Sequence, residues 1–338
     1  MDFLDGKARA AALAGMPSEV TQTLRYFLSA GGKRVRPLLC LIGWHAGGGT
    51  GGDAAPVVRV AASLEMFHAF ALVHDDIMDR SDSRRGRPAV HRALAARHSR
   101  GRSASDADHI GEGAAILIGD LALAWSDELL YSAGLDPVQL ADVLPVVSEM
   151  RTEVMYGQYL DLTSGGLPTG DLDRALAISR YKTAKYTIER PLHIGAALAG
   201  SSQALREALS AYALPLGEAF QLRDDLLGVF GDPCATGKPR MDDLREGKHT
   251  ALVALAYQHA TTDQRNTLDA LLGRRGLTDS DAGSLRRLLV DTGACARVEQ
   301  LITIRHEQAE RALDSAGLSP QVAAALRTAA GGAVVRNS

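Results

Sequence analysis

Residues 72–80 read LVHDDIMDR, and they end a long apolar segment that begins near residue 54. Apolar residues recur there at three- and four-residue spacing, which predicts a helix over 54–80. Asp75 and Asp79 are four residues apart, so their side chains share one helix face. The two carboxylates repel each other, and the negative end of the helix dipole disfavours them further unless a cation is present. An isolated acidic helix end is usually just solvated, but the apolar flanks here predict a partly enclosed magnesium site.

A second acidic cluster of the same form follows much later in the chain. Residues 220–228 read FQLRDDLLG and again end an apolar segment, with Gln221 about one turn before Asp224. Metal sites in helix bundles are built from side chains on facing helices. We therefore expect the two clusters to face each other across a bundle and to hold one diphosphate through several magnesium ions.

The rest of the chain repeats the helical pattern, and no segment shows sustained strand alternation. Glycine and small polar residues predict loops at 46–56, 99–113, 164–170 and 231–247. Long helices joined by short loops predict one all-α domain over residues 1–338, a single large helical bundle. The other helices are expected near 17–30, 37–45, 111–133, 137–163, 171–199, 203–230, 248–260, 262–273, 278–291, 295–316 and 319–330.

Composition argues against several other classes of protein. The 338 residues carry a net charge of −3, whereas a nucleic-acid-binding domain is usually basic. Three widely spaced cysteines show neither metal-ligand nor disulfide spacing and fit a reducing compartment. The first residues lack the apolar core of a secretory signal, and the longest apolar candidate, 114–125, is interrupted by Asp120 and falls short of a membrane span. We expect a cytoplasmic protein with no transmembrane segment and no nucleic-acid partner.

Basic residues stand where an anionic substrate would need them. Residues 83–88 read SRRGRP directly after the first cluster, and arginine forks suit phosphate oxygens. Residues 31–37 read GGKRVRP, and glycines followed by cations before a helix can cradle phosphate, although the spacing of a Walker loop is missing. The long charged loop between Lys238 and Lys248 suits a lid over an anion. Taken alone, SRRGRP is more often a solvated basic turn, GGKRVRP is weak evidence, and the charged loop fits ordinary solvated surface equally well.

In combination, these segments resemble the trans-isoprenyl diphosphate synthases, also called polyprenyl synthetases. The resemblance implies an isoprenoid synthase fold around a central cavity, a homodimer, and magnesium-dependent condensation of isopentenyl diphosphate with an allylic diphosphate. The ordered set is specific although no single element is. The elements are GGKRVRP at 31–37, EMFHAFALVHDDIMD at 65–79, RRGRP at 84–88, GQYLDL at 157–162, YKT at 181–183, QLRDD at 221–225, GDPCATGKP at 231–239 and DDLREGK at 242–248.

The resemblance also implies a role for each matching residue. The first aspartate motif comprises Asp75, Asp76 and Asp79, and the second contains Asp224 and Asp225. Three magnesium ions are expected with the diphosphate, on the ligands Asp75, Asp79 and Asp224. The isopentenyl diphosphate headgroup is matched by Lys33, Arg36, His68 and Arg85. The allylic diphosphate side is matched by Arg84, Lys182, Gln221, Lys238 and Lys248. Thr183 and Gln158 match positions that support the reacting centre.

The second motif departs from the family pattern at its last position. A third aspartate usually stands there, whereas this chain has Gly228, and Asp232 lies beyond the expected helix end. The first aspartate of the motif is the main metal ligand in the family, so we expect activity to survive. The missing carboxylate puts a supporting contact behind the metal in doubt.

Product length is expected to depend on Phe70 and Ala71. In the family, one aromatic residue five positions before the first aspartate resembles a twenty-carbon, geranylgeranyl enzyme, and two neighbouring aromatics resemble a fifteen-carbon, farnesyl enzyme. Ala71 is small and leaves room for a growing tail one turn before Asp75. At ~100° per residue, Phe70 points away from Asp75 and fits ordinary core equally well. Geranylgeranyl diphosphate is the expected product, and farnesyl diphosphate is the alternative.

Two further interpretations stay open. A class I terpene cyclase also uses a DDxxD helix, but residues 221–232 lack its second metal motif and it gives no reason for GGKRVRP or RRGRP. An inactive partner subunit of another synthase should show eroded aspartates or arginines, and only Gly228 points that way.

Overall fold

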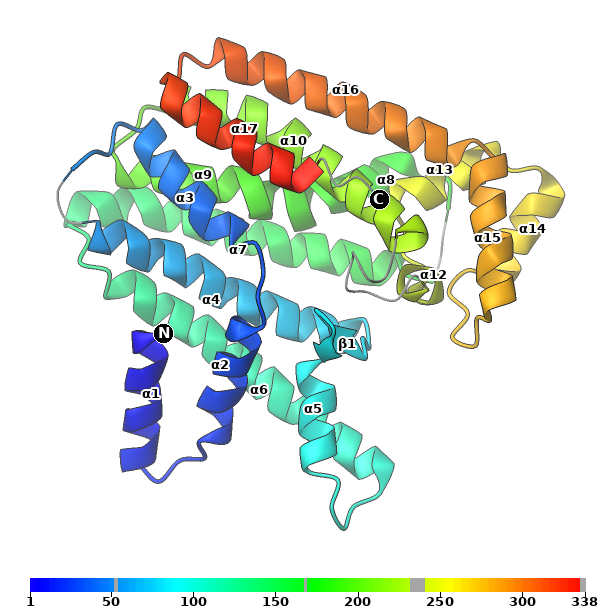
Figure 1. The fold of residues 1–338 in the computed structure, drawn as a ribbon, viewed down its shortest axis with the longest axis horizontal. Helices are drawn as coiled ribbons and strands as arrows, with labels where there is room; N and C mark the ends of the chain where they lie inside the picture. Colours follow the sequence, from blue (N-terminus) through cyan, green and yellow to red (C-terminus); the bar gives the residue numbers. More distant parts are fainter. Residues whose placement is uncertain (52–53, 167–168, 232–240, 335–338) are drawn as a thin grey trace. The chain divides into compact units, whose positions relative to one another are not determined.

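The computed structural model describes residues 1–51, 54–166, 169–231 and 241–334, and these are almost entirely helical, which confirms the all-α prediction (Figure 1). The chain divides into two compact units. The first comprises Met1–Arg34 and Arg59–Ala133, and the second comprises Val35–Val58 and Gly134–Ser338. The expectation of a single domain that spans both units stays a prediction.

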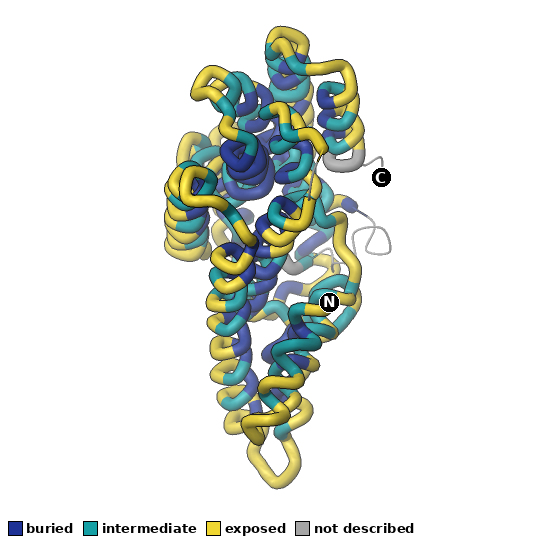
Figure 2. The backbone as a smooth tube through the Cα atoms, turned by 90° about the vertical axis from the view of Figure 1, so that its left-hand side faces the viewer, coloured by how far each residue is buried: buried dark blue, intermediate teal, exposed yellow. Residues whose placement is uncertain are grey.

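The first unit is built on the long helix that carries the first acidic cluster. Its core joins Leu24, Met66, Val73, Leu94 and Ala115, which come from four of its helices. In Figure 2 the helices carry runs of buried residues, whereas the tips of the loops are exposed. Its elements are α1 (Asp2–Leu13), α2 (Glu19–Ser29), α4 (Ala55–Met78, whose first residues belong to the second unit), β1 (Ser83–Arg84), β2 (Arg87–Pro88), α5 (Val90–Arg97) and α6 (Ala104–Tyr131).

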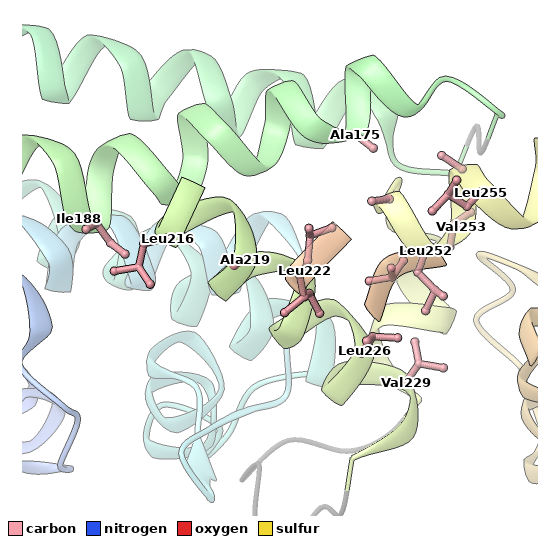
Figure 3. Close-up of a cluster of buried hydrophobic side chains, with 14 of the residues drawn as sticks. Ala175, Ile188, Leu216, Ala219, Leu222, Leu226, Val229, Leu252, Val253 and Leu255 are labelled. Carbon is pink, nitrogen blue, oxygen red and sulfur yellow. The ribbon is translucent and has the colours of Figure 1, made fainter. Parts of the chain in front are cut away.

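The second unit surrounds α10, which packs against α16 and η1. Its apolar residues Leu216, Leu222, Leu226 and Val229 lie in one cluster with the leucines of α13 (Figure 3). The elements are α3 (Val35–Ala46), α7 (Pro137–Ser164), α8 (Leu172–Ile178), η1 (Ser179–Glu189), α9 (Arg190–Leu198), α10 (Gln203–Phe230), α12 (Asp242–Glu246), α13 (Ala251–His259), α14 (Thr262–Leu271), α15 (Asp279–Asp291), α16 (Ala294–Ser315) and α17 (Pro320–Val334).

Several sequence-based boundaries were wrong. The predicted loop 99–113 is helical from Ala104, because Ser103 caps α6 by accepting a hydrogen bond from the Asp106 amide at 3.1 Å. Gly111 suggested a loop, but its missing side chain lets α6 approach α5, since a Cβ there would lie 2.4 Å from the His91 carbonyl oxygen. The helices α1 and α5, the short α12 and the hairpin β1–β2 were not predicted at all.

The segment 171–199 was predicted as one helix and is in fact three. Its middle part, η1, is a π-helix, a form that often occurs at functional sites. Glycines let two neighbouring helices approach it closely. A Cβ at Gly157 of α7 would lie 2.5 Å from the Lys182 amide nitrogen, and a Cβ at Gly217 of α10 would lie 2.4 Å from the Ala184 Cα. These contacts hold η1 between α7 and α10.

One described helix, α4, is long and apolar enough to cross a membrane by length and composition, and half of its most apolar window is buried. The longest apolar candidate expected from the sequence, 114–125, lies instead within α6. Met66, Ala69 and Val73 of α4 belong to the core cluster of the first unit, as expected for a core helix of a globular protein.

Candidate active site

The first acidic cluster lies at the end of α4, and the backbone closes the helix there. The Ser81 amide donates to the Asp76 carbonyl and the Arg80 amide to the Ile77 carbonyl, at 2.9 and 3.1 Å. Arg80 has a φ of 55°, so this is a Schellman closure in which an arginine takes the left-handed position usually given to glycine. The closure turns the chain directly from the aspartates into the arginine hairpin.

Arg84 faces the carboxylates of the first cluster. Its guanidinium lies 2.6 Å from an Asp76 oxygen and 3.2 Å from an Asp75 oxygen. Asp76 has no exposed side-chain surface. Burial would lower the pKa of Arg84, but the charges of Asp76, Asp75 and Asp79 outweigh it and raise that pKa. The predicted residues Asp75, Asp76, Asp79 and Arg84 are therefore one electrostatic group.

The hairpin β1–β2 also brings Arg85 to the glycine loop. Arg85 and Gly86 both have positive φ angles, 54° and 71°, as a two-residue type I′ turn requires. The Arg85 side chain donates to the Gly31 carbonyl at 2.5 Å. A Cβ at Gly32, whose φ is +117°, would lie 2.7 Å from the same guanidinium. Gly32 thus provides space for Arg85, and Lys33 is the next residue in that exposed loop.

Two consecutive residues of η1 reach two different helices. Lys182 donates to Asp161 of α7 at 2.6 Å, and Thr183 donates to the Gln221 side-chain oxygen of α10 at 2.6 Å. Gln221 in turn donates to Asp225 at 2.7 Å. A chain of hydrogen bonds therefore runs from Thr183 to the second acidic cluster, and it fixes the Gln221 amide orientation.

The second acidic cluster combines a buried carboxyl group with like charges close to it. Asp225 is buried, whereas Asp224 beside it is half-buried. Burial raises the pKa of Asp225 to about 7, the charges of Asp243 and Asp224 act in the same direction, and the hydrogen bond from Gln221 opposes them. Divalent cations with a preference for oxygen ligands fit such a donor set.

This raised pKa predicts the pH dependence of stability. The folded protein holds the Asp225 proton up to about pH 7, while the unfolded chain releases it near the ordinary value of 3.8. Stability from this group is therefore present at low pH and is lost as pH rises towards 7. Asp225→Asn should be more stable than the parent at pH 8, by a few kcal/mol, with a smaller difference at pH 5. Urea unfolding in EDTA measures this.

The control for that prediction is Asp281→Asn in α15. Hydrogen bonds from Thr278 lower the pKa of this half-buried aspartate below its ordinary value of 3.8. Its stabilisation is therefore complete by pH 5, and the difference between parent and Asp281→Asn should stay constant from pH 5 to 8. A difference between parent and Asp225→Asn that does not change between pH 5 and 8 would contradict the assignment.

The remaining predicted residues are distributed over both units. Arg36 of α3 donates to Thr187 of η1 at 2.6 Å, and its guanidinium lies 4.2 Å from the Tyr186 ring centroid. Lys248 lies 2.9 Å from Glu246 and 3.7 Å from Asp243. His68 on α4 and Gln158 on α7 are half-buried. Lys238 lies outside the described residues.

Sequence reasoning missed two carboxylates. Asp161 was part of the quoted motif GQYLDL, but nothing in the sequence indicated that it pairs with Lys182. Asp243 was part of DDLREGK, and only the structure places its carboxylate against Gly228, where a Cβ would lie 1.9 Å from an Asp243 oxygen.

Within the described ranges, no three His, Cys, Asp or Glu side chains form a ready-made metal centre. Magnesium does not need one, because it commonly keeps several waters and binds through one or two carboxylates together with substrate phosphates.

Proteins with a similar fold or sequence indicate the class to which this chain belongs. The structure aligns with a geranylgeranyl pyrophosphate synthase from Corynebacterium glutamicum, solved with isoprenyl diphosphate and magnesium, at a TM-score of 0.95 and 41% identity over 99% of this chain and 96% of that one. A geranylfarnesyl diphosphate synthase from Aeropyrum pernix is 35% identical over 82% of this chain and 81% of its own length. A (2E,6E)-farnesyl diphosphate synthase from Mycobacterium tuberculosis is 33% identical over 81% of this chain and 71% of its own length. All three relatives are named as synthases of prenyl diphosphates. The class of protein is therefore that of the all-α prenyl diphosphate synthases.

The polyprenyl synthetase family model matches residues 17–289, and the chain belongs to that family. It is a trans-prenyltransferase, a metal-dependent enzyme of isoprenoid biosynthesis that uses isopentenyl and allylic diphosphates. The relatives differ in product length, from farnesyl through geranylgeranyl to geranylfarnesyl.

Proposed function

We propose that the enzyme makes geranylgeranyl diphosphate by magnesium-dependent, head-to-tail condensation. The observation that carries the proposal is a pair of acidic helix ends, each with a cationic side chain beside it. Arg84 lies against Asp75 and Asp76 in the first unit, and Lys248 lies near Asp243 beside the second cluster. In this proposal both ends grip one diphosphate, with Asp75, Asp79 and Asp224 holding three magnesium ions.

Bound magnesium would supply a positive charge for the diphosphate that leaves. The residues of the chain bind the two substrates. Arg84, Lys182, Lys238 and Lys248 bind the allylic diphosphate, and Lys33, Arg36, His68 and Arg85 bind isopentenyl diphosphate. The allylic C–O bond breaks, and the electron pair leaves with the diphosphate. The double bond of isopentenyl diphosphate then attacks the allylic cation, and the proton lost from that unit goes to the departing diphosphate.

Thr183 and Gln221 position the second acidic cluster in this scheme. Thr183 donates to the Gln221 side-chain oxygen at 2.6 Å, and Gln221 donates to Asp225 at 2.7 Å. Gln158 stands on α7, which also carries Asp161. Apolar walls are needed to keep water from the cation. No side-chain nucleophile takes part.

The twenty-carbon product is supported by the likeness to the Corynebacterium synthase and by the surroundings of Phe70. The Phe70 ring packs on Phe67 and His74, with ring centroids 5.3 and 4.7 Å apart. His74 in turn lies against α6, 3.1 Å from the Ile116 carbonyl oxygen. This packing holds the ring in one orientation, as a floor for the growing chain requires.

Phe70→Ala is therefore expected to shift the products beyond twenty carbons, because the removed ring opens space below Ala71. Chromatography of products from labelled isopentenyl diphosphate, with each allylic starter and magnesium, measures the shift. Phe67→Ala, which removes a fully buried neighbour, is the matched control. An unchanged product mixture in Phe70→Ala shows that Phe70 is ordinary core.

The same assay on the parent protein tests the function itself. Geranylgeranyl diphosphate as the main product supports the proposal, and farnesyl diphosphate supports the alternative. A cyclic hydrocarbon from geranylgeranyl diphosphate alone would indicate a cyclase, and no turnover without a second protein would indicate a partner subunit.

A cytoplasmic homodimer is part of the proposal. The α7 face exposes Met155, Tyr156, Tyr159 and Leu162, with 46% to 67% of each residue accessible. Apolar residues spaced three and four apart form a stripe of the kind that covers itself by association. Sedimentation equilibrium measures the assembly state, and a monomer at micromolar concentration contradicts this part.

A further inference from the structure

Gly228 occupies the position in α10 where the family pattern has a third aspartate. It lies four residues after Asp224, so a side chain there would share the helix face of that metal-ligand candidate. The space is not empty. A Cβ at residue 228 would lie 1.9 Å from the Asp243 Oδ2 and 3.0 Å from its carboxyl carbon. The Asp243 carboxylate therefore fills the volume that a residue 228 side chain would take.

The local backbone holds Asp243 in that place. Asp243 is the second residue of α12, which packs against α10. Gly247 ends α12 in the left-handed conformation with a φ of 63°, and a Cβ there would lie 2.8 Å from Gly273. The turn brings the Lys248 amide back to the Asp243 carbonyl at 3.2 Å and the Lys248 ammonium within 3.7 Å of its carboxylate.

Charge favours a functional role over simple space filling. The negative charges of Asp243 and Asp224 both act on the buried Asp225 carboxyl, and the positive charge of Lys248 opposes them. Placing another carboxylate in this group costs free energy unless a cation balances it. A neutral residue would fill the space beside Gly228 without that cost.

We propose that Asp243 supplies from α12 the third carboxylate that residue 228 lacks, and that Gly228 is required to admit it. Asp243 is a positioning residue in this account, and it acts on the metal–diphosphate site through Asp224, Asp225 and Lys248. The inference rests on the proposed function, because that function provides the cations that the cluster holds.

A double-mutant cycle tests the coupling between the two positions. Gly228→Ala displaces the Asp243 carboxylate, and Asp243→Ala removes it. Each should weaken the apparent affinity for magnesium with inorganic diphosphate by about 10-fold or more, as for other residues that support metal ligands. The double variant Gly228→Ala/Asp243→Ala should bind magnesium with inorganic diphosphate no more weakly than either single variant. Gly228→Asp combined with Asp243→Ala should recover binding, because it returns a carboxylate to the same space.

The main measurement is the rise in thermal midpoint when magnesium and inorganic diphosphate are added together, which does not depend on turnover. Gly113→Ala is the matched control for adding a methyl group to a helical glycine, since a Cβ there meets nothing within 4 Å. Asp263→Asn controls for the loss of one exposed carboxylate in the second unit. If Asp243→Ala does not fold, Asp243→Asn preserves the shape and removes only the charge.

The outcomes separate this inference from the proposed function. Normal turnover by the parent, together with additive effects or an unchanged midpoint rise in the Asp243 variants, overturns the role of Asp243. A parent protein that forms no prenyl diphosphate overturns the proposed function. Non-additive losses with recovery in Gly228→Asp/Asp243→Ala support the inference.

Discussion

Replacing Asp75 or Asp224 with alanine is expected to lower the rate of prenyl transfer by about 1,000-fold or more, the scale seen when a group that stabilises the developing charge is removed. In the proposed function these carboxylates hold the cations that stabilise the leaving diphosphate. The rate of incorporation of labelled isopentenyl diphosphate, at saturating substrates and magnesium, measures the effect.

Asp82→Ala is the matched control, because Asp82 is an aspartate three residues after the first cluster. Its side chain is 86% exposed and pairs with Arg92 at 2.9 Å. It should retain the parent rate. The thermal midpoint of each variant separates loss of function from loss of folding. Undiminished turnover in the combined Asp75→Ala/Asp224→Ala variant would refute the proposed function. Neither aspartate would then be needed to hold the diphosphate through magnesium.

The helices that carry the acidic clusters were predictable because their apolar periodicity is long and uninterrupted. Residues 54–80 and 203–230 were predicted as helices, and α4 and α10 agree to within two residues. The way α4 ends was not predictable. Arg80 in the left-handed conformation is unfavourable locally, and only the Schellman hydrogen bonds to Asp76 and Ile77 show why it is adopted.

The π-helix η1 illustrates a different limit. A segment of eleven residues is too short for its period to be told from that of an α-helix, so 171–199 looked continuous. Gly157 and Gly217 show their meaning only when α7 and α10 are seen on either side of η1. Glycine in a sequence indicates either a break or a close approach, and the neighbour that decides between them is far away in the chain.

The individual site residues were predictable as a set of motifs, whereas their pairings were not. Arg84 follows Asp75 closely in sequence, and a charge contact between them could have been expected. The contact of Lys182 with Asp161, and that of Asp243 with the space beside Gly228, join residues on separate elements. Nothing in spacing or composition selects such partners, because tertiary packing sets them.

Replacing Arg84 with alanine is expected to destabilise the metal-free protein by about 3 kcal/mol, the scale for breaking a buried ion pair. Asp76 has no exposed side-chain surface, and Arg84 Nε donates to it at 2.7 Å. Removing the guanidinium leaves a buried negative charge beside Asp75 and Asp79 with less to balance it. Urea unfolding at pH 7.5 in EDTA measures the loss.

Arg92→Ala provides the matched control, because Arg92 is 36% exposed and its partners Asp82 and Asp108 are at the surface. Its cost should stay within about 1 kcal/mol, as for exposed ion pairs. Adding Asp76→Asn to Arg84→Ala should recover part of the lost stability, since the buried charge disappears with its partner. Magnesium should also stabilise Arg84→Ala more than the parent, because a divalent ion can then take over the balancing charge at the end of α4. Equal costs for the two arginine variants would show that Arg84 does not neutralise the first acidic cluster.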